Sequence, residues 1–342
     1  MASPKTNLAL IVNEKPFSRI IQDRGVPTPG AEELLVRVEA AGLNPVDARL
    51  GNFPRVIAMW PTFPTVIGAE AAGVVISLGS EVKGFQIGDR VAFGTAGQKI
   101  DISSYQQYSL AHSSIVAKLP STISLEEGAS IPVGLFTSYH ALYAQPPDGA
   151  GLVSPMSPGR RGKYAGHLQL ARLSGFSTII TTASLKHSDW LKSLGATHII
   201  DRTLPDAAVV DAISALAPGL SIVFDSISTP ETSSLGVAVL VASKKHTQGK
   251  KTLLQVIGIP VVEAESEAID VYMGWATSAW PQYNALSREL YPRVEELLVD
   301  GSIKPLKIEV VRGGFNALEE AFKTFDKVSG VKRVVLPHET TV

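Results

Sequence analysis

The sequence contains no cysteine. That absence excludes disulfide bonds, thiolate zinc sites, iron–sulfur clusters and a cysteine nucleophile. The chain also lacks a dominant charge, because 31 Lys and Arg oppose 32 Asp and Glu and give a net charge of -1. Nucleic acids and anionic membrane surfaces attract basic proteins, so neither is an expected partner. The expected ligand is a small molecule that enters a pocket.

Long hydrophobic runs are absent too. No apolar stretch approaches the ~20 residues of a membrane-spanning helix. Residues 1–12 hold one lysine and a short apolar run, which is less than a signal-peptide core requires. We therefore expect a cytoplasmic protein, as a monomer or homodimer. With 342 residues, 45% of them hydrophobic, the chain is typical of a globular protein of about two domains.

The pattern of expected secondary structure changes near Ser124. Before it, short β-branched or alternating runs are divided by Gly and Pro, as in a barrel or sandwich. Ser124 and Glu127 form a capping-box pattern that leads into a helix over 128–143. Strands and helices then alternate as in a parallel, doubly wound sheet. The expected strands are 7–12, 33–40, 73–78, 90–93, 178–183, 198–201, 221–225, 252–257, 307–311 and 332–336, and the later helices are 188–194, 206–216, 233–243, 285–300 and 317–328.

Several motifs of the first part occur in a recognisable order. Residues 42–47 are Gly-Leu-Asn-Pro-Val-Asp and residues 63–75 are Phe-Pro-Thr-Val-Ile-Gly-Ala-Glu-Ala-Ala-Gly-Val-Val. Residues 78–84, Leu-Gly-Ser-Glu-Val-Lys-Gly, and 88–91, Gly-Asp-Arg-Val, follow. This order resembles the GroES-like domain of the medium-chain dehydrogenase/reductase superfamily, and more narrowly its quinone-reductase and fungal trans-enoyl-reductase branches. The terminal Val-Lys-Arg-Val-Val-Leu, 331–336, extends the resemblance over nearly the whole chain.

The resemblance implies an α/β fold of two domains. A GroES-like substrate domain is expected over 1–123, completed by 301–342, with a Rossmann-like nucleotide domain over 124–300. The glycines between the short strands indicate this fold and no chemistry, because they only permit tight turns and positive φ.

Zinc-dependent relatives carry a His before the Glu of a Gly-His-Glu segment, with Cys ligands elsewhere. Here the segment is Gly68-Ala69-Glu70, and the methyl group of Ala69 cannot ligate a metal. The seven histidines show no ligand spacing, and a catalytic zinc needs three protein ligands. We predict no metal.

The residues after the second strand of a Rossmann domain select the cofactor. NAD-binding domains place Asp or Glu there, whereas residues 181–186 are Thr-Thr-Ala-Ser-Leu-Lys. The Ser184 hydroxyl and the Lys186 ammonium suit a 2′-phosphate, so the sequence favours NADPH over NADH. Lys186 as an ordinary surface lysine is the alternative interpretation.

The segment before that second strand is shorter than the resemblance predicts. Relatives have a buried first strand and a Gly-rich turn that leads into a helix whose amides hold the pyrophosphate. In this chain Pro-Gly-Arg-Arg-Gly-Lys-Tyr-Ala-Gly, 158–166, is followed directly by residues 167–176, which resemble the back half of that helix. Roughly fifteen residues are missing by this comparison. We predict that the nucleotide sheet lacks its first strand.

Two alternatives to this deletion remain open. In the first, Gly159 and Gly162 with Arg160, Arg161 and Lys163 form a phosphate loop of their own, although Pro155 and Pro158 argue against a preceding strand. In the second, residues 151–153 serve as a makeshift first strand. A skipped or wrongly predicted exon is a hypothesis for the origin of the junction between Gly166 and His167.

For an intact relative, the resemblance implies hydride transfer from NADPH to the β-carbon of an α,β-unsaturated carbonyl, followed by protonation of the α-carbon. The candidate catalytic residues are Asn44, in the Asn-Pro-Val-Asp turn, and Thr137, near the nicotinamide amide. Either could instead serve the backbone as a cap. Gly258 and Ile259 are expected beside the nicotinamide. Ala48 and Arg49 stand where quinone reductases often have Tyr, so the sequence names no general acid.

The substrate is not readable from the sequence, because residues 53–60 and 273–280 give the expected pocket walls only an apolar, aromatic character. A second class of function is a catalytically inactive variant that keeps the fold and acts as a non-catalytic partner.

Overall fold

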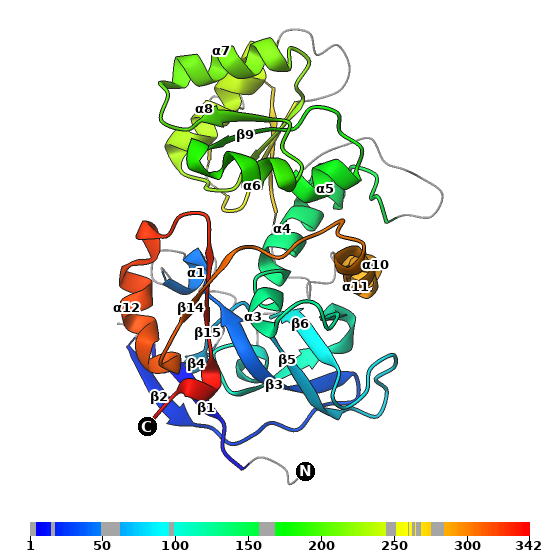
Figure 1. Cartoon of the computed structure of the whole chain (residues 1–342), viewed down its shortest axis with the longest axis vertical. Helices are drawn as coiled ribbons and strands as arrows, with labels where there is room; N and C mark the ends of the chain where they lie inside the picture. Colours follow the sequence, from blue (N-terminus) through cyan, green and yellow to red (C-terminus); the bar gives the residue numbers. More distant parts are fainter. Residues whose placement is uncertain are drawn as a thin grey trace. The chain divides into compact units, whose positions relative to one another are not determined.

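The computed structural model describes residues 5–14, 18–48, 62–95, 99–156, 168–243, 251–258, 260–261, 264, 268–274 and 284–342. The chain divides into two compact units, Met1–Leu135 with Thr277–Val342, and Phe136–Ala276. The domain limits expected from the sequence stay a prediction. Figure 1 shows the strand-rich first unit and the second unit, in which helices flank short strands.

The first unit contains two sheets of mainly antiparallel strands. The smaller has the order β2-β1-β4, and the larger has the order β14-β15-β3-β5-β6-β8, with β7 also paired to β3. The strands expected at 7–12, 33–40, 73–78, 90–93, 307–311 and 332–336 are confirmed, whereas β2, β4, β7 and β8 were not predicted. The bounds are β1 Leu8–Val12, β2 Arg19–Asp23, β3 Glu33–Gly42, β4 Thr65–Val66, β5 Glu70–Leu78, β6 Arg90–Gly94, β7 Tyr108–His112, β8 Val116–Lys118, β14 Ile308–Val311 and β15 Lys332–Val335.

Close backbone approach explains two glycines near the start of β5. A Cβ atom on Gly73 would lie 2.0 Å from the carbonyl oxygen of Arg37 on β3. Gly68 has φ +104, and a Cβ atom there would lie 2.3 Å from Ser104 Oγ. Only glycine fits both positions without displacing a neighbour. The turn at Gly68 brings the chain into β5, whose first residue is Glu70.

The described helices of the first unit are short, and the longer α4 begins in the first unit and continues into the second. α3 (Leu125–Gly128) begins with the predicted capping box, in which Ser124 Oγ accepts from the Glu127 amide at 3.1 Å and Glu127 Oε2 accepts from the Ser124 amide at 2.9 Å. α4 (Pro132–Tyr143) follows it. The other helices are α1 Pro45–Ala48, α10 Asn284–Leu290, α11 Val294–Val299 and α12 Leu318–Lys323.

Two predicted helices of the tail are wrong as single elements. The helix expected over 285–300 is divided into α10 and α11 by a 3-10 turn, Tyr291–Arg293, that contains Pro292. Proline has no amide hydrogen for the helical ladder, so it breaks the helix where it stands. The helix expected over 317–328 is likewise shortened to α12, with 3-10 turns on either side.

The strand pairs described in the second unit are all parallel. β10 pairs with β9, and β12 pairs with both β11 and β13. The sequence did not predict the strand β13. The elements are α5 Leu168–Leu173, β9 Ile180–Ala183, α6 Ser188–Ser193, β10 His198–Asp201, α7 Asp206–Leu216, β11 Ile222–Asp225, α8 Pro230–Ala242, β12 Thr252–Gln255 and β13 Asp270–Met273.

The parallel strands form two separate sheets, β10-β9 and β11-β12-β13. Among the described residues, no strand lies between α4 and α5 in the chain, as expected for a missing first strand. Residues 151–153 carry no strand, so the makeshift-strand alternative is wrong. The junction of Gly166 and His167, and the alternative phosphate loop at 159–163, lie outside the described residues.

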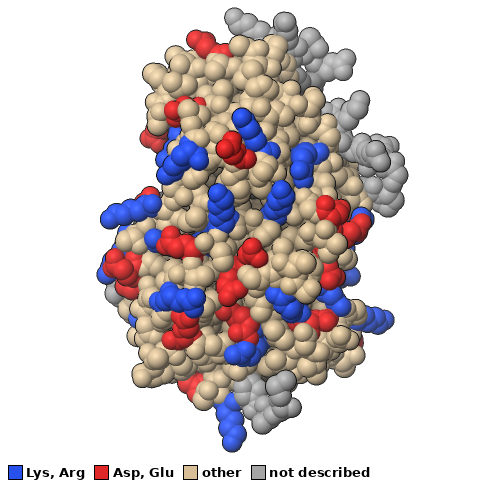
Figure 2. Space-filling view, viewed as in Figure 1, with Lys and Arg blue, Asp and Glu red and all other residues tan. Residues whose placement is uncertain are grey.

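The described helices include none that is long and apolar enough to cross a membrane. Acidic and basic side chains are interspersed on the face seen in Figure 2, as the balanced composition leads one to expect.

Candidate functional site

A buried group of charged and polar side chains lies at the meeting point of β3, β5 and β15. Glu70 is fully buried, and its Oε1 is 2.5 Å from the ammonium of Lys332. Its Oε2 accepts a hydrogen bond from the Val133 amide at 2.8 Å, in the first turn of α4. A helix N-terminus and an ammonium therefore share the negative charge of one carboxylate.

Asn44 belongs to this group. Its Oδ1 accepts from Lys332 Nζ at 2.6 Å, and its Nδ2 donates to Glu70 Oε1 at 3.1 Å. The side chain is buried, and both ends of its carboxamide are engaged by charged partners. This arrangement fixes the orientation of the carboxamide. The catalytic role expected for Asn44 stays a proposal.

Asp47 completes the turn of α1. Its Oδ2 accepts from the Asn44 amide at 2.9 Å and from the Tyr105 hydroxyl at 2.9 Å. Its Oδ1 is buried and has no hydrogen-bond partner among the described residues. Burial raises the pKa of Asp47 to about 6, against the lowering effects of the Tyr105 hydroxyl, the Asn44 amide and Lys332. This carboxyl group therefore titrates near neutrality.

Of this cluster, the sequence analysis proposed a role for Asn44 and for no other member. Tyr105 is fully buried, and burial followed by the charge of Asp47 raises its pKa well above the usual value. The Gly68-Ala69-Glu70 segment was interpreted only for zinc binding, which Ala69 cannot support, and no role was predicted for Glu70. Nothing in the spacing along the chain indicates that Asp47 meets Tyr105 or that Lys332 meets Glu70.

Three of the residues expected at the cofactor, Ser184, Lys186 and Gly258, follow the carboxyl ends of parallel strands in the second unit. Ser184 follows β9 directly as the half-buried N-cap of a 3-10 turn, and its side chain makes no capping hydrogen bond there. Lys186 is exposed two residues later. Gly258 follows β12, and Ile259 lies outside the described residues. Ligands of open parallel sheets bind beyond this end of the strands.

Thr137 is half-buried on α4. Its carbonyl oxygen lies 3.0 Å from the position that a Cβ atom on Gly274 would take, so the end of β13 passes close to this helix. Asn44 belongs to the first unit and Thr137 to the second. The role expected for Thr137 stays a proposal as well.

A second polar cluster, which the sequence also did not predict, shapes the end of β11. Asp225 accepts from the amides of Ile227 and Ser228 and from the hydroxyls of Thr232 and Ser233, at 2.7–3.0 Å. Ser228 takes a positive φ of 56 in this turn. The Asp225 carboxylate therefore anchors the loop between β11 and α8, because four donors converge on it.

Comparison with known proteins identifies the family. Residues 30–139 match the model of the alcohol dehydrogenase GroES-like domain. The quinone-oxidoreductase homolog, chloroplastic, of Spinacia oleracea is 30% identical over 263 residues, which cover 69% of this chain and 77% of that protein. The chain belongs to the medium-chain dehydrogenase/reductase superfamily. Other relatives of this superfamily member are named dehydrogenases and trans-enoyl reductases, and the chain is accordingly an oxidoreductase of a class that uses nicotinamide cofactors.

Two fungal relatives extend the match. Dehydrogenase azaJ of Aspergillus niger is 27% identical, with 97% of this chain and 99% of that protein covered. The alignment spans 349 positions, more than the 342 residues of this chain. It therefore contains positions at which this chain has a gap. Trans-enoyl reductase tazE of Aspergillus terreus is 36% identical over 213 residues, which cover 56% of this chain and 67% of that protein.

Solved structures support the fold of this superfamily member. The quinone oxidoreductase from Coxiella burnetii superimposes with a TM-score of 0.66 at 21% identity, covering 97% of this chain and 99% of that one. An alcohol dehydrogenase superfamily protein from Novosphingobium aromaticivorans gives 0.72 at 18% identity, with 97% and 99% covered.

The described part of this superfamily member shows no group of three His, Cys, Asp or Glu side chains that could hold a metal. We expect purified protein to contain no stoichiometric zinc after dialysis, because Ala69 offers no ligand and the chain has no thiolate. Elemental analysis by mass spectrometry measures this directly. Zinc at one equivalent per chain that resists dialysis would contradict the prediction.

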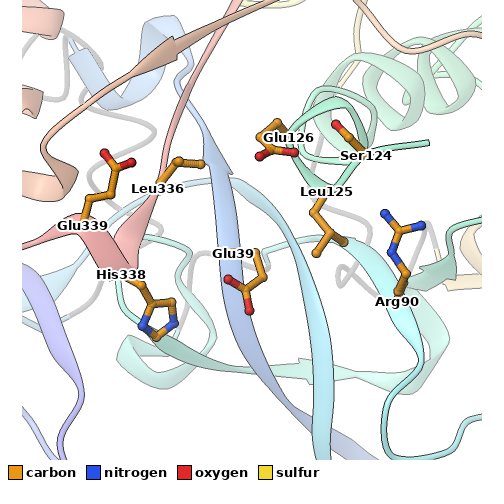
Figure 3. A pocket seen from close by; sticks show the side chains of 8 residues that line it. All are labelled: Glu39, Arg90, Ser124, Leu125, Glu126, Leu336, His338 and Glu339. Atoms are coloured by element: carbon orange, nitrogen blue, oxygen red, sulfur yellow. The ribbon is translucent and has the colours of Figure 1, made fainter. Parts of the chain in front are cut away.

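A surface hollow of about 470 Å³ lies in the first unit, apart from the buried cluster (Figure 3). The hollow is lined by acidic, basic, polar and apolar side chains. Burial lowers the pKa of His338, one of these residues, to about 4. The lining residues are Glu39, Arg90, Ser124, Leu125, Glu126, Leu336, His338 and Glu339. None of the residues expected from the sequence to bind cofactor lies there.

Proposed function

We propose that the chain is an NADPH-dependent, zinc-independent oxidoreductase that reduces an α,β-unsaturated carbonyl of the enoyl or quinone type. The observation that carries the proposal is the 36% identity to a trans-enoyl reductase, together with Ala69 in place of a metal ligand. The relative named as a quinone-oxidoreductase homolog supports the same substrate class. A cytoplasmic location and a small-molecule substrate belong to this proposal.

The described residues fit the 2′-phosphate of NADPH better than its pyrophosphate. Ser184 and Lys186 offer a hydroxyl and a cation beyond β9, which suit the 2′-phosphate. No glycine opens α6, α7 or α8, which follow His187, Pro205 and Thr229, and the residues before α5 lie outside the described part of the chain. Pyrophosphate normally binds such glycine-opened helix amides. We therefore derive no reaction step through the cofactor, whose own chemistry would be hydride transfer.

The protein's own residues would position the reacting groups. Asn44 is held by Lys332 and Glu70, so its carboxamide would present one fixed N–H direction to a substrate oxygen. Thr137 would contact the nicotinamide amide, and Gly258 and Ile259 would line its side. Fluorescence titration of the full chain with NADPH tests the proposal, and saturable micromolar binding with turnover of an enoyl or quinone substrate is the supporting result.

Cofactor preference is tested by Lys186→Glu. We expect this change to weaken NADPH binding about tenfold or more and to leave NADH nearly unchanged, because a charge-assisted contact to phosphate contributes about 1.5–3 kcal/mol. Dissociation constants from fluorescence titration measure the effect. Lys192→Glu, at an exposed lysine of α6, is the matched control. Equal weakening of both cofactors would refute the assignment of Lys186.

The second candidate function is a catalytically impaired variant of such a reductase, which acts, if at all, as a non-catalytic partner. The division of the parallel strands into two sheets favours it. On this second candidate function the chain as it stands binds NADPH weakly, and an insertion of about fifteen residues, strand plus glycine turn, between Gly166 and His167 should tighten binding at least about tenfold.

The control for this insertion is a Gly/Ser segment of equal length at the same position, which should leave NADPH binding weak. The measurement is the dissociation constant from fluorescence titration, with turnover of an enoyl or quinone substrate measured in parallel. Turnover by the unmodified chain near the enzyme median of about 10 per second would refute impairment.

A further inference from the structure

Two serine hydroxyl groups join the end of β11 to the end of β12. Ser228 Oγ donates to the backbone carbonyl oxygen of Asp225 at 3.0 Å and accepts from the Val256 amide at 2.9 Å. Ser233 Oγ donates to Asp225 Oδ2 at 2.7 Å and accepts from Gln255 Nε2 at 2.9 Å. The last residue of β12 and the residue after it are therefore each connected to Asp225 through one hydroxyl group.

This hydrogen-bond network lies in the interior of the second unit. Four of its members are buried, namely Asp225, Ser228, Ser233 and Gln255. Water therefore competes little for their hydrogen bonds, and each bond is stronger than it would be at the surface. A buried network of this kind holds one geometry, because other arrangements leave polar groups without partners. The ends of β11 and β12 are accordingly fixed relative to each other.

Ser228 has a backbone conformation that side chains other than glycine seldom adopt. Its φ is +56, in the left-handed region. Asp225 Oδ1 stabilises this turn by accepting from the amides of Ile227 and Ser228 at 3.0 and 2.9 Å. A strained conformation persists only where its surroundings fix it. Glycine would take this φ without strain, but it has no hydroxyl group to accept from the Val256 amide.

The backbone that this network holds is the backbone proposed to meet the nicotinamide. The chain leaves the carboxyl end of β12 at Val256, and Gly258 follows two residues later. β12 is the middle strand of β11-β12-β13, and ligands of open parallel sheets bind beyond this end of the strands. The carbonyl oxygen of Gln255 also accepts from the Gly274 amide at 2.8 Å, and Gly274 lies close to Thr137 on α4. The network is thus connected to both Gly258 and Thr137.

We propose that Ser228 is a positioning residue for the nicotinamide of the cofactor. Its hydroxyl group holds the Val256 amide and so fixes the path of the backbone from β12 to Gly258. Asp225 acts one step further away, because it holds Ser228. This inference rests on the proposed function, which brings a nicotinamide to Gly258. The nicotinamide is common to NADPH and NADH, so Ser228 should affect both cofactors equally.

Ser228→Ala tests the inference, because it removes only the hydroxyl oxygen. Without cofactor, we expect hydrogen exchange at the Val256 amide to become at least about tenfold faster, since the amide loses its acceptor. With cofactor, we expect the dissociation constants of NADPH and NADH each to rise about tenfold. The fluorescence emission of bound NADPH, which reports the surroundings of the nicotinamide, should move toward that of free NADPH. Ser228→Gly, which relieves the strained φ, should give the same changes and provides a second variant if Ser228→Ala does not fold.

Ser243→Ala is the matched control. Ser243 is buried like Ser228 but lies at the other end of α8, where its hydroxyl group donates to the carbonyl oxygen of Ala217 at 3.4 Å. This change should leave exchange at Val256, both dissociation constants and the emission of bound NADPH unaltered. Thermal unfolding of both variants is measured in parallel, so that a general loss of stability is distinguished from a change at the cofactor.

Each readout can overturn the inference. Unchanged exchange at Val256 in both Ser228 variants overturns it, whatever happens to cofactor binding. Faster exchange with unaltered dissociation constants, or with weaker binding of NADPH alone, overturns it as well, because the backbone held by Ser228 would then not meet the nicotinamide. If the natural chain binds neither cofactor, the proposed function fails and the inference fails with it. The exchange measurement needs no cofactor, so it distinguishes that failure from an error about Ser228 itself.

Discussion

Replacing Lys332 by methionine is expected to lower the free energy of unfolding by about 3–5 kcal/mol. The change leaves the fully buried Glu70 without its ammonium partner, and it removes the hydrogen bond to Asn44 Oδ1. A lone buried carboxylate must either remain charged in a poor solvent or take up a proton, and both cost stability. Urea unfolding followed by circular dichroism measures the loss.

Two controls distinguish the cost of leaving a buried charge unpaired from the cost of losing an ion pair as such. The double change Glu70→Gln with Lys332→Met removes both charges and should recover about 1–2 kcal/mol of the loss, since no unpaired ion remains. Arg293→Met breaks an exposed ion pair with Glu296 and should cost less than about 1 kcal/mol. If Lys332→Met costs no more than Arg293→Met, the buried pair does not stabilise the first unit.

Asp47 should make the stability of the first unit depend on pH. Its pKa is raised by burial from 3.8 to about 6 in the folded chain, so its favourable contribution is complete below pH 4 and is lost as the pH rises through 6. The difference corresponds to about 3 kcal/mol. Relative to Asp47→Asn, which cannot titrate, the natural chain should therefore lose about that much stability between pH 4 and pH 7.

The measurement is the urea midpoint of both proteins at intervals across this range. Asp201→Asn is the control, because hydrogen bonds from Thr203 lower the pKa of Asp201 below 3.8 and place its titration under this window. A constant difference between the natural chain and Asp47→Asn from pH 4 to pH 7 would show that Asp47 keeps its usual pKa when folded.

The sequence by itself determined the fold class, because local patterns carry that information. Short strands with glycine turns, then strands alternating with helices, gave the two kinds of sheet, and the capping box at Ser124 is local by nature. The order of segments also predicted that a first strand before β9 is missing. Pro292 was visible too, and applying the rule for proline inside helices would have corrected the single helix expected over 285–300.

Only the tertiary structure decided which polar residues meet. Asn44, Glu70 and Lys332 come from three distant segments, and their hydrogen bonds depend on β15 pairing with β3 and on β3 pairing with β5. The raised pKa of Asp47 likewise depends on how completely the folded chain buries it beside Tyr105. Periodicity and spacing describe neighbours along the chain, whereas burial and ion pairing are set by neighbours in space, and so the sequence alone did not predict them.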